Sequence, residues 1–213
     1  MTEKKPIHLE NRTQTGARLF SPTAARNREP IADILADLMQ QNAEVLEIAS
    51  GTGEHALHMC QRRPDVIWQP SDPNAESRAS QEVWASESDG RMLPSLDIDT
   101  SQPAWSEGLG PYDVLFCANM IHIAPWEAAL GLATGAKTLI KPSGMVVLYG
   151  PFKEGENTAP SNLEFDASLK SRDPRWGVRD LISVKHIFAK IGFSNVQRIV
   201  MPKNNLILVF QRS

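Results

Sequence analysis

Short apolar runs alternate with helical patterns along most of this chain. Four runs are almost continuously apolar and are bounded by turn residues, which is typical of strands buried on both faces of a parallel sheet. They cover residues 44–49, 66–69, 112–118 and 145–149. A weaker run over residues 91–98 is expected to form a further strand. The last two runs, 195–201 and 206–211, flank Pro-Lys-Asn-Asn and predict an antiparallel hairpin.

The segments between these runs carry apolar residues at the helical period. The first helix is expected to begin at Pro30, because proline suits a first helical turn and the apolar residues from Ile31 to Met39 keep the helical spacing. The other helices are expected over residues 55–63, 74–87, 125–140 and 183–191. Alternation of strand and helix predicts an α/β fold with a parallel sheet and helices on both faces.

The chain length suits a single domain. Its 213 residues are enough for one full hydrophobic core, so we treat residues 1–213 as one unit. Residues 1–23 are polar and are expected to form a loosely held N-terminal arm. Residues 151–180 form a long insertion rich in Asn, Asp, Gly and Trp, and a loop of this length is more often functional than idle.

Composition and charge narrow the possible partners. The net charge is -3, which gives no general attraction to nucleic acid or to anionic membranes. Cys60 and Cys117 lie far apart in apolar settings and indicate buried free thiols in a reducing compartment. The N-terminus lacks the apolar core of a signal peptide, and no apolar run approaches a membrane span. We therefore expect a cytoplasmic protein that binds neither nucleic acid nor a membrane.

The stretch VLEIASGTGEH turns sharply from a strand into a helix at Gly51, Thr52 and Gly53. In an open parallel sheet, ligands bind beyond the carboxyl ends of the strands, and glycine lets a ligand approach the main chain. Two ligands use such a turn: a dinucleotide, with its pyrophosphate on the helix N-terminus, and S-adenosylmethionine. The loose dinucleotide pattern G-x-G-x-x-G/A is met by Gly51, Gly53 and Ala56, and this match alone does not decide between the two.

Acidic residues lie in or at the ends of the first three strands. Glu47 precedes Gly51 by four residues, and Asp72 ends the second strand, where a carboxylate can accept both ribose hydroxyls of either ligand. Asp97 ends the third strand, where a carboxylate can accept a hydrogen bond from an adenine amino group. Each acid also has a structural alternative as a turn or capping residue. Asp97 favours S-adenosylmethionine over a dinucleotide.

These features resemble the class I S-adenosylmethionine-dependent methyltransferases over residues 30–213, with E-x-x-x-G-x-G as the central motif. The resemblance implies a Rossmann-like seven-stranded sheet with six parallel strands and a last antiparallel one. A narrower resemblance covers nearly the whole chain and is to a little-characterised methyltransferase-like family of bacteria and animals, a domain of unknown function. It is carried by SPTAARNREPI, EIASGTGEH, QPSDP, NMIHIAPW, YGPF, SNLEFD, WGVRD and MPKNNL.

The resemblance implies S-adenosyl-L-methionine as the cofactor, held over the glycine turn and the strand ends. The residues implied to contact it are Glu47, Gly51, Thr52, Gly53, Asp72, Asp97, Ile98 and Asn119, together with Arg26 and Asn27 from the segment before the first helix. His55 and His58 lie three apart on a helix, but no further ligand accompanies them at metal-binding spacing, so no metal site is expected.

Asn119 and His122 follow the fourth strand, the usual place for catalytic residues in this fold. His122 titrates near neutrality and is the candidate catalytic base, and the alternative is a histidine bonded to the backbone beneath the cofactor. The insertion over residues 151–180 is expected to cover the acceptor pocket, and the alternative is a surface lid with an aromatic anchor. The substrate-facing candidates are Tyr149, Asn162, Asp166, Trp176 and Arg179.

The sequence therefore predicts S-adenosylmethionine-dependent methyl transfer to a small-molecule acceptor. The donor is already activated, so the protein mainly has to align acceptor and methyl group and to exclude water. Two alternatives stay open. One is an NAD(P)-dependent oxidoreductase, and the other is a non-catalytic S-adenosylmethionine-binding partner protein that keeps the fold.

Overall fold

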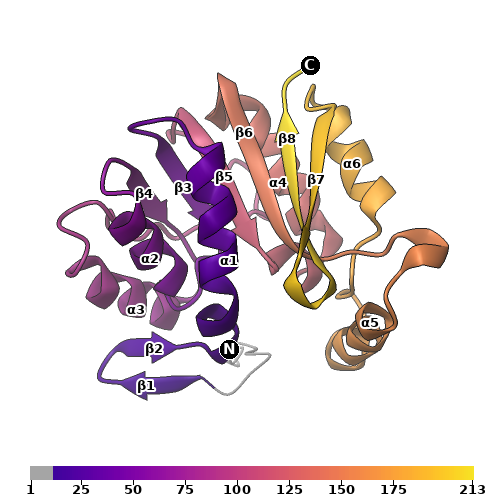
Figure 1. Cartoon of the computed structure of the whole chain (residues 1–213), viewed down its shortest axis with the longest axis horizontal. Helices are drawn as coiled ribbons and strands as arrows, with labels where there is room; N and C mark the ends of the chain where they lie inside the picture. Colours follow the sequence, from indigo (N-terminus) through magenta and orange to yellow (C-terminus); the bar gives the residue numbers. More distant parts are fainter. Residues whose placement is uncertain (1–11) are drawn as a thin grey trace.

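A six-stranded sheet forms the centre of the molecule, in a computed structural model that describes residues 12–213 (Figure 1). The strand order is β4-β3-β5-β6-β8-β7. The strands are β3 (Glu44–Ile48), β4 (Ile67–Pro70), β5 (Tyr112–Ala118), β6 (Ile140–Pro151), β7 (Asn195–Met201) and β8 (Asn205–Gln211). β3 pairs in parallel with β4 and β5, β5 pairs in parallel with β6, and β8 is antiparallel to both β6 and β7. The predicted α/β fold with a closing antiparallel hairpin is confirmed.

The predicted count of seven strands is wrong by one among the described residues. The run over residues 91–98 makes isolated parallel bridges, Trp68 with Met92 and Ser71 with Leu96, and no continuous strand. The next bond of this ladder would come from the N–H of residue 70, but Pro70 of β4 has no N–H to donate, which explains why the pairing stops there. The sheet therefore has five strands running in one direction and β8 running against them.

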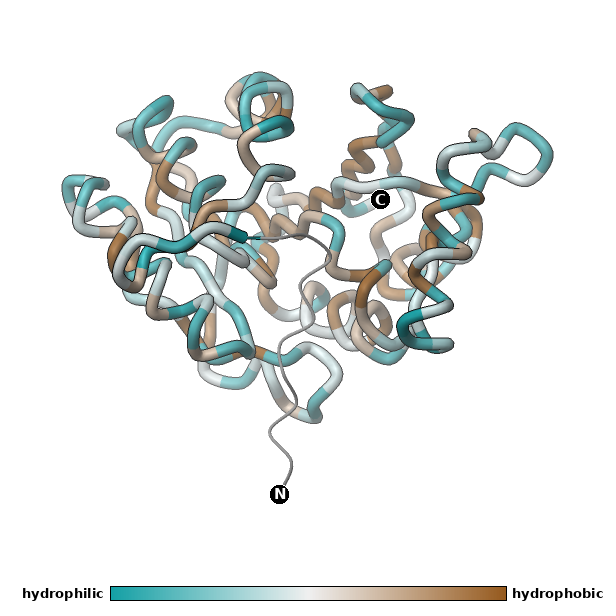
Figure 2. Tube along the Cα trace, turned by 90° about the horizontal axis from the view of Figure 1, so that it is seen from below, coloured by the Kyte–Doolittle hydropathy of each residue, from teal (hydrophilic) through white to brown (hydrophobic). Residues whose placement is uncertain are grey.

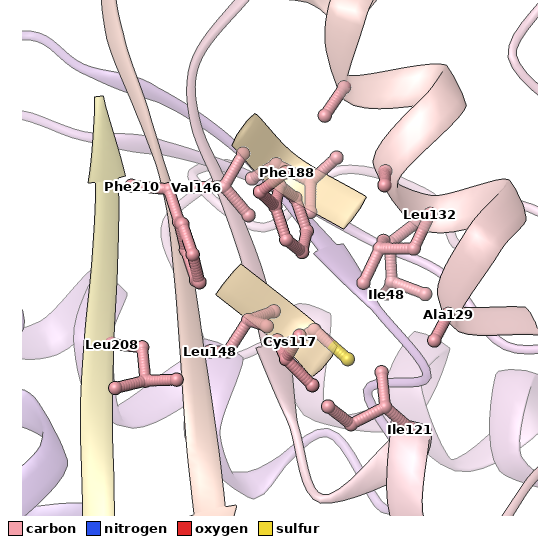
Figure 3. Close-up of a cluster of buried hydrophobic side chains, with 14 of the residues drawn as sticks. Ile48, Cys117, Ile121, Ala129, Leu132, Val146, Leu148, Phe188, Leu208 and Phe210 are labelled. Atoms are coloured by element: carbon pink, nitrogen blue, oxygen red, sulfur yellow. The ribbon is translucent and has the colours of Figure 1, made fainter. Parts of the chain in front are cut away.

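Helices cover both faces of this sheet. They are α1 (Pro22–Leu38), α2 (Glu54–Arg62), α3 (Ala75–Ala85), α4 (Trp126–Leu139), α5 (Pro160–Arg172) and α6 (Leu181–Ala189). Successive strand residues point to opposite faces. Thus Leu115 packs in the cluster with α4 and α6, while Val114 and Phe116 pack in the cluster with α1 and α2. Apolar segments gather in the interior and polar ones at the periphery (Figure 2), and Figure 3 shows the first cluster, with Phe188 of α6 beside Phe210 of β8.

The first helix begins eight residues earlier than the sequence predicts. Ser21 is its N-cap and accepts a hydrogen bond from the backbone of Ala24 at 3.0 Å, so Pro22 takes the first helical position. Pro30 lies inside the helix. Arg26 and Asn27 consequently lie on α1 and not in an extended arm.

A small hairpin precedes α1 and is docked on α3. It consists of β1 (Thr13–Thr15) and β2 (Arg18–Phe20). The backbone of Leu19 donates to Ser80 Oγ at 2.8 Å, and Phe20 packs edge-on against Trp84 at 5.3 Å between ring centroids. Part of the predicted loose arm is therefore anchored, and residues 1–11 of that arm lie outside the described residues. Among residues 12–213, no helix is both long and apolar enough to cross a membrane.

The loop before β5 packs tightly against α4. A Cβ atom at Gly131 would lie 1.7 Å from the carbonyl oxygen of Thr100, and one at Gly135 would lie 2.1 Å from the ring of Trp105. These two glycines let the loop lie directly on the helix backbone.

We predict that Gly131→Ala lowers the free energy of unfolding by about 2 kcal/mol, because the added methyl group meets backbone that must shift. Urea denaturation followed by circular dichroism measures the change. Thr134→Ala, an exposed change on the same helix, is the control and is expected within about 0.5 kcal/mol of the wild type. Equal stability of the two variants would contradict this packing.

Candidate functional site

A cavity of about 360 Å³ lies beyond the carboxyl ends of β3, β5 and β6. Figure 1 shows the β1–β2 hairpin and α5 at this same, lower end of the molecule. The wall is formed by Arg12, Ser21, Thr23, Ala24, Arg26, Asn27, Glu47, Ala49, Ser50, Gly51, Thr52, His55, Ala118, Asn119, Ile123, Tyr149, Pro151, Phe165 and Asn205. Of the predicted site residues, the cavity brings together Arg26, Asn27, Glu47, Gly51, Thr52, Asn119 and Tyr149.

The conformation of the glycine turn is fixed by hydrogen bonds to the side chain of Asp72. Gly51 has φ +59° and Gly53 has φ +94°, values that favour glycine. Asp72 accepts hydrogen bonds from the backbone of Gly51 at 3.0 Å and of Asn74 at 2.9 Å, and burial raises the pKa of its carboxyl group. Asp72 thus fixes the turn from behind and is not among the wall residues, whereas Gly51 itself faces the cavity.

Glu47 places a buried carboxyl group in the wall. Its side chain is 1% exposed and accepts a hydrogen bond from Trp68 Nε1 at 2.9 Å. Burial raises the pKa of this carboxyl group to about 7, so it is close to half-ionised at neutral pH. A cationic ligand in the cavity would favour the ionised form.

Two residues that the sequence analysis missed complete this side of the site. Glu54, the first residue of α2, is buried and accepts hydrogen bonds from the backbone of Ser21 at 2.6 Å and from Thr52 Oγ1 at 2.9 Å. Arg12 lines the cavity, and its Nη2 lies 3.4 Å from where a Cβ of Gly51 would be. Both depend on contacts between the hairpin, α1 and the glycine turn, which no local pattern of the sequence indicates.

Asn119 ends β5 in a left-handed conformation with φ +61° and caps the short helix Met120–His122. This conformation is uncommon outside glycine, and Asn is one of the residues that tolerate it. Asn119 lies in the cavity wall, and its backbone N–H donates to the carbonyl oxygen of Tyr149 in β6 at 2.8 Å.

His122 lies beneath the cavity and not in its wall. Its side chain is fully buried, its Nδ1 accepts a hydrogen bond from the backbone of Arg179 at 3.1 Å, and its Nε2 faces Gly150. Because Nδ1 accepts, the proton of the neutral ring is on Nε2, which leaves no free lone pair for a substrate proton. Burial lowers the pKa of this imidazole to about 3. The contacts therefore match the alternative of a backbone-bonded histidine and give no support to the predicted catalytic base.

The predicted contacts at the third strand are also not in the cavity wall. Asp97 is exposed and pairs with Arg78 at 3.0 Å, and Ile98 is packed in the hydrophobic core. Gly53 lies behind the turn, where a Cβ atom would meet Gln81 at 3.1 Å. The strand that would have carried Asp97 to the cavity is replaced by the irregular segment over residues 91–98.

The polar residues of the insertion hold it in place. Asp166 pairs with Lys153 at 2.7 Å and Lys170 at 2.9 Å, and Asn162 donates to the carbonyl groups of Phe152 and Asn204. Four predicted substrate contacts therefore lie outside the cavity wall, and they are Asn162, Asp166, Trp176 and Arg179.

Trp176 and Arg179 secure the end of the insertion. Trp176 is buried against Leu169 and Val178, and Arg179 donates to the carbonyl groups of Ile121 at 2.8 Å and Ala124 at 2.6 Å. The insertion reaches the cavity through Pro151 and through Phe165 of α5, neither of which the sequence analysis singled out. No group of three or more His, Cys, Asp or Glu within residues 12–213 is placed to hold a metal ion.

The chain belongs to the family described as protein of unknown function DUF938, which matches residues 18–212. This membership fits the narrower resemblance seen in the sequence. The fold is that of class I methyltransferases, as comparison with solved structures shows.

Three solved structures illustrate the shared fold. An O-methyltransferase family protein from Burkholderia thailandensis has a TM-score of 0.77 and 18% identity, over 89% of this chain and 57% of that one. Human N-acetylserotonin methyltransferase in complex with SAM has a TM-score of 0.74 and 12% identity, over 90% and 53%. An O-methyltransferase family 2 protein from Planctomyces limnophilus, in complex with apigenin, has a TM-score of 0.72 and 15% identity, over 90% and 60%. The chain thus spans somewhat more than half the length of these proteins.

We predict that His122 stays neutral from pH 8 down to about pH 4. The folded pKa is lowered to about 3 from 6.5, so the unfolded chain takes up this proton first, and the residue's contribution to stability is lost as the pH falls from 6.5 toward 3. Histidine NMR titration measures the midpoint, with a His122→Gln variant to assign the resonance. A midpoint above 6 would overturn the buried placement.

Proposed function

We propose that this protein is an S-adenosylmethionine-dependent methyltransferase that acts on a small-molecule acceptor. The observation that carries the proposal is the cavity at the carboxyl ends of β3, β5 and β6, where the open backbone of Gly51 and the carboxyl group of Glu47 lie in one wall. The methyltransferase fold, with its antiparallel β8, supports it.

The residues of the cavity fit this cofactor. Gly51 has no side chain between its backbone and the cavity, and Glu47 offers negative charge to a sulfonium or ammonium group. Within residues 12–213, Asn27 Oδ1 is buried without a hydrogen-bond partner and can accept from a ligand. When bound, the cofactor supplies an activated methyl group, and the chain aligns an acceptor with it and excludes water.

The acceptor side of the cavity is largely uncharged. Ile123, Pro151 and Phe165 give it apolar surface, and Asn119 and Asn205 give it polar groups without charge. Such a lining suits a compact, partly apolar small molecule. The solved protein from Planctomyces limnophilus, which shares the fold, is in complex with apigenin, a small molecule.

Binding measurements separate the oxidoreductase alternative from the proposed function. A dinucleotide would place its pyrophosphate on the N-terminus of α2. Charge alone leaves this alternative open, because the acids Glu47 and Glu54 lie there together with Arg12 and Arg26 of the cavity wall. A non-catalytic binding protein is separated from an enzyme by transfer of a labelled methyl group to any compound of a metabolite extract.

We predict that the wild type binds S-adenosylmethionine and that Gly51→Ala weakens this binding at least tenfold, because the methyl group fills the space over the turn. Gly155→Ala is the matched control, since Gly155 has the same φ of +59° and open space around it. Isothermal titration calorimetry measures both. Wild-type protein that binds NADH and not S-adenosylmethionine would refute the proposed function.

We predict that affinity for S-adenosylmethionine rises as the pH is raised from 6 to 8. Glu47 has its pKa raised to about 7, so it gains its negative charge across this range and then attracts the cationic ligand. The same shift makes the unliganded protein less stable as the pH rises from 4.5 to 7, because the folded state holds this proton longer than the unfolded chain. Glu47→Gln is expected to flatten the pH dependence of binding, and exposed Glu44→Gln is expected to retain it.

A further inference from the structure

Asn27 carries an unsatisfied hydrogen-bond acceptor into the cavity wall. The residue is 8% exposed, and its Oδ1 is buried without a partner among the described residues. Its amide lies close enough to the Tyr149 hydroxyl to act on it: burial raises the pKa of this phenol, and the Asn27 amide opposes that rise, as an N–H donor would. An acceptor left unpaired in a buried position costs about 1–3 kcal/mol, so this atom points to a ligand that donates a hydrogen bond.

Tyr149 supplies a donor next to that acceptor. It lies at the end of β6, is 4% exposed and lines the same cavity. Its hydroxyl group lies beside Asn27 and can donate its hydrogen to a ligand. Burial raises the pKa of this phenol, which keeps the hydrogen in place at neutral pH.

Arg26 adds a positive charge beside the Tyr149 hydroxyl. It precedes Asn27 on α1, lines the cavity and acts electrostatically on the phenol of Tyr149. Its guanidinium donates to Thr23 Oγ1 at 3.0 Å, and its other N–H groups, unpaired among residues 12–213, can bind an anion. This part of the wall therefore offers a hydrogen-bond acceptor, Asn27 Oδ1, to a positively charged donor. It also offers a hydrogen-bond donor, the Tyr149 hydroxyl, and the cation Arg26 to a negatively charged acceptor.

We infer that Asn27, Tyr149 and Arg26 form a receptor for an α-amino-acid group, with the ammonium on Asn27 Oδ1 and the carboxylate on the Tyr149 hydroxyl and the Arg26 guanidinium. An ammonium and a carboxylate on one carbon match this pairing of acceptor and donors in sign, and the three residues line one cavity. The tail of S-adenosylmethionine carries this group, and in that form the inference rests on the proposed function. A free amino acid carries it too. Tyr149 then becomes a binding residue for this group and not for the methyl acceptor.

Two adenosine ligands test the inference, because they differ in the amino-acid group. S-adenosylhomocysteine has it and 5′-methylthioadenosine lacks it. Asn27→Leu, Tyr149→Phe and Arg26→Ala are each expected to weaken binding of S-adenosylhomocysteine about 10- to 100-fold, as expected for loss of a hydrogen bond to a charged group. Binding of 5′-methylthioadenosine is expected to change less than twofold. Calorimetry measures both ligands.

Controls separate a local effect from a loss of fold. Tyr112→Phe and Asn157→Leu make the same chemical changes outside the cavity wall and are expected to bind both ligands as the wild type does. Tyr149→Phe removes one oxygen atom and keeps the ring, so it serves where Asn27→Leu does not fold. Variants that retain full affinity for S-adenosylhomocysteine, or that lose both ligands equally, would overturn the inference.

A third ligand, L-methionine, separates the inference from the proposed function. If the wild type binds neither adenosine compound, the proposed function fails. Binding of L-methionine that is lost in Asn27→Leu and Tyr149→Phe would then still support the receptor, with a free amino acid as its ligand. No binding of any of the three compounds would overturn both.

Discussion

The buried carboxylate of Glu54 joins the parts of the chain that build the cavity. It accepts from the backbone of Ser21, the N-cap of α1, and from Thr52 in the glycine turn. A charged acceptor with two such donors makes strong hydrogen bonds in a poorly solvated place. Through this one side chain the start of α1 is fixed beside the end of β3. The wall residues of α1 and those of the glycine turn therefore face the same space.

Polar residues around the cavity fall into two groups with different tasks. Asp72, His122, Asp166 and Arg179 are committed to partners within the protein, and each holds a loop that borders the cavity. Asn27, Glu47 and Asn119 face the cavity itself. This division follows from the strand ends, where the backbone leaves the sheet and its polar groups need partners. The committed residues supply those partners, so the others remain available to a ligand.

Much of the fold could be predicted from apolar runs and turns, and the residues nearest the glycine turn followed from it. Glu47, Gly51, Thr52 and Asn119 are fixed by strands whose ends the sequence marks clearly. The predictions failed where contacts between residues far apart in the sequence determine the structure. Ser21 caps α1 because Glu54 and the hairpin place it there, so Pro30 was a misleading start signal. A polar residue at the right position in the chain, such as His122 or Trp176, gives no local sign of whether it faces the cavity or packs behind it.

The insertion over residues 151–180 uses different residues to hold itself in place and to line the cavity. The ion pair of Asp166 with Lys153 lies within the segment, Asn162 and Arg179 bond the segment to the body of the protein, and Pro151 and Phe165 line the cavity. Replacing Phe165 would reshape the pocket without loosening Asp166 or Asn162 from their partners. A change at this one aromatic position would therefore alter the shape of the pocket together with the packing against Leu169, Trp176 and Val178.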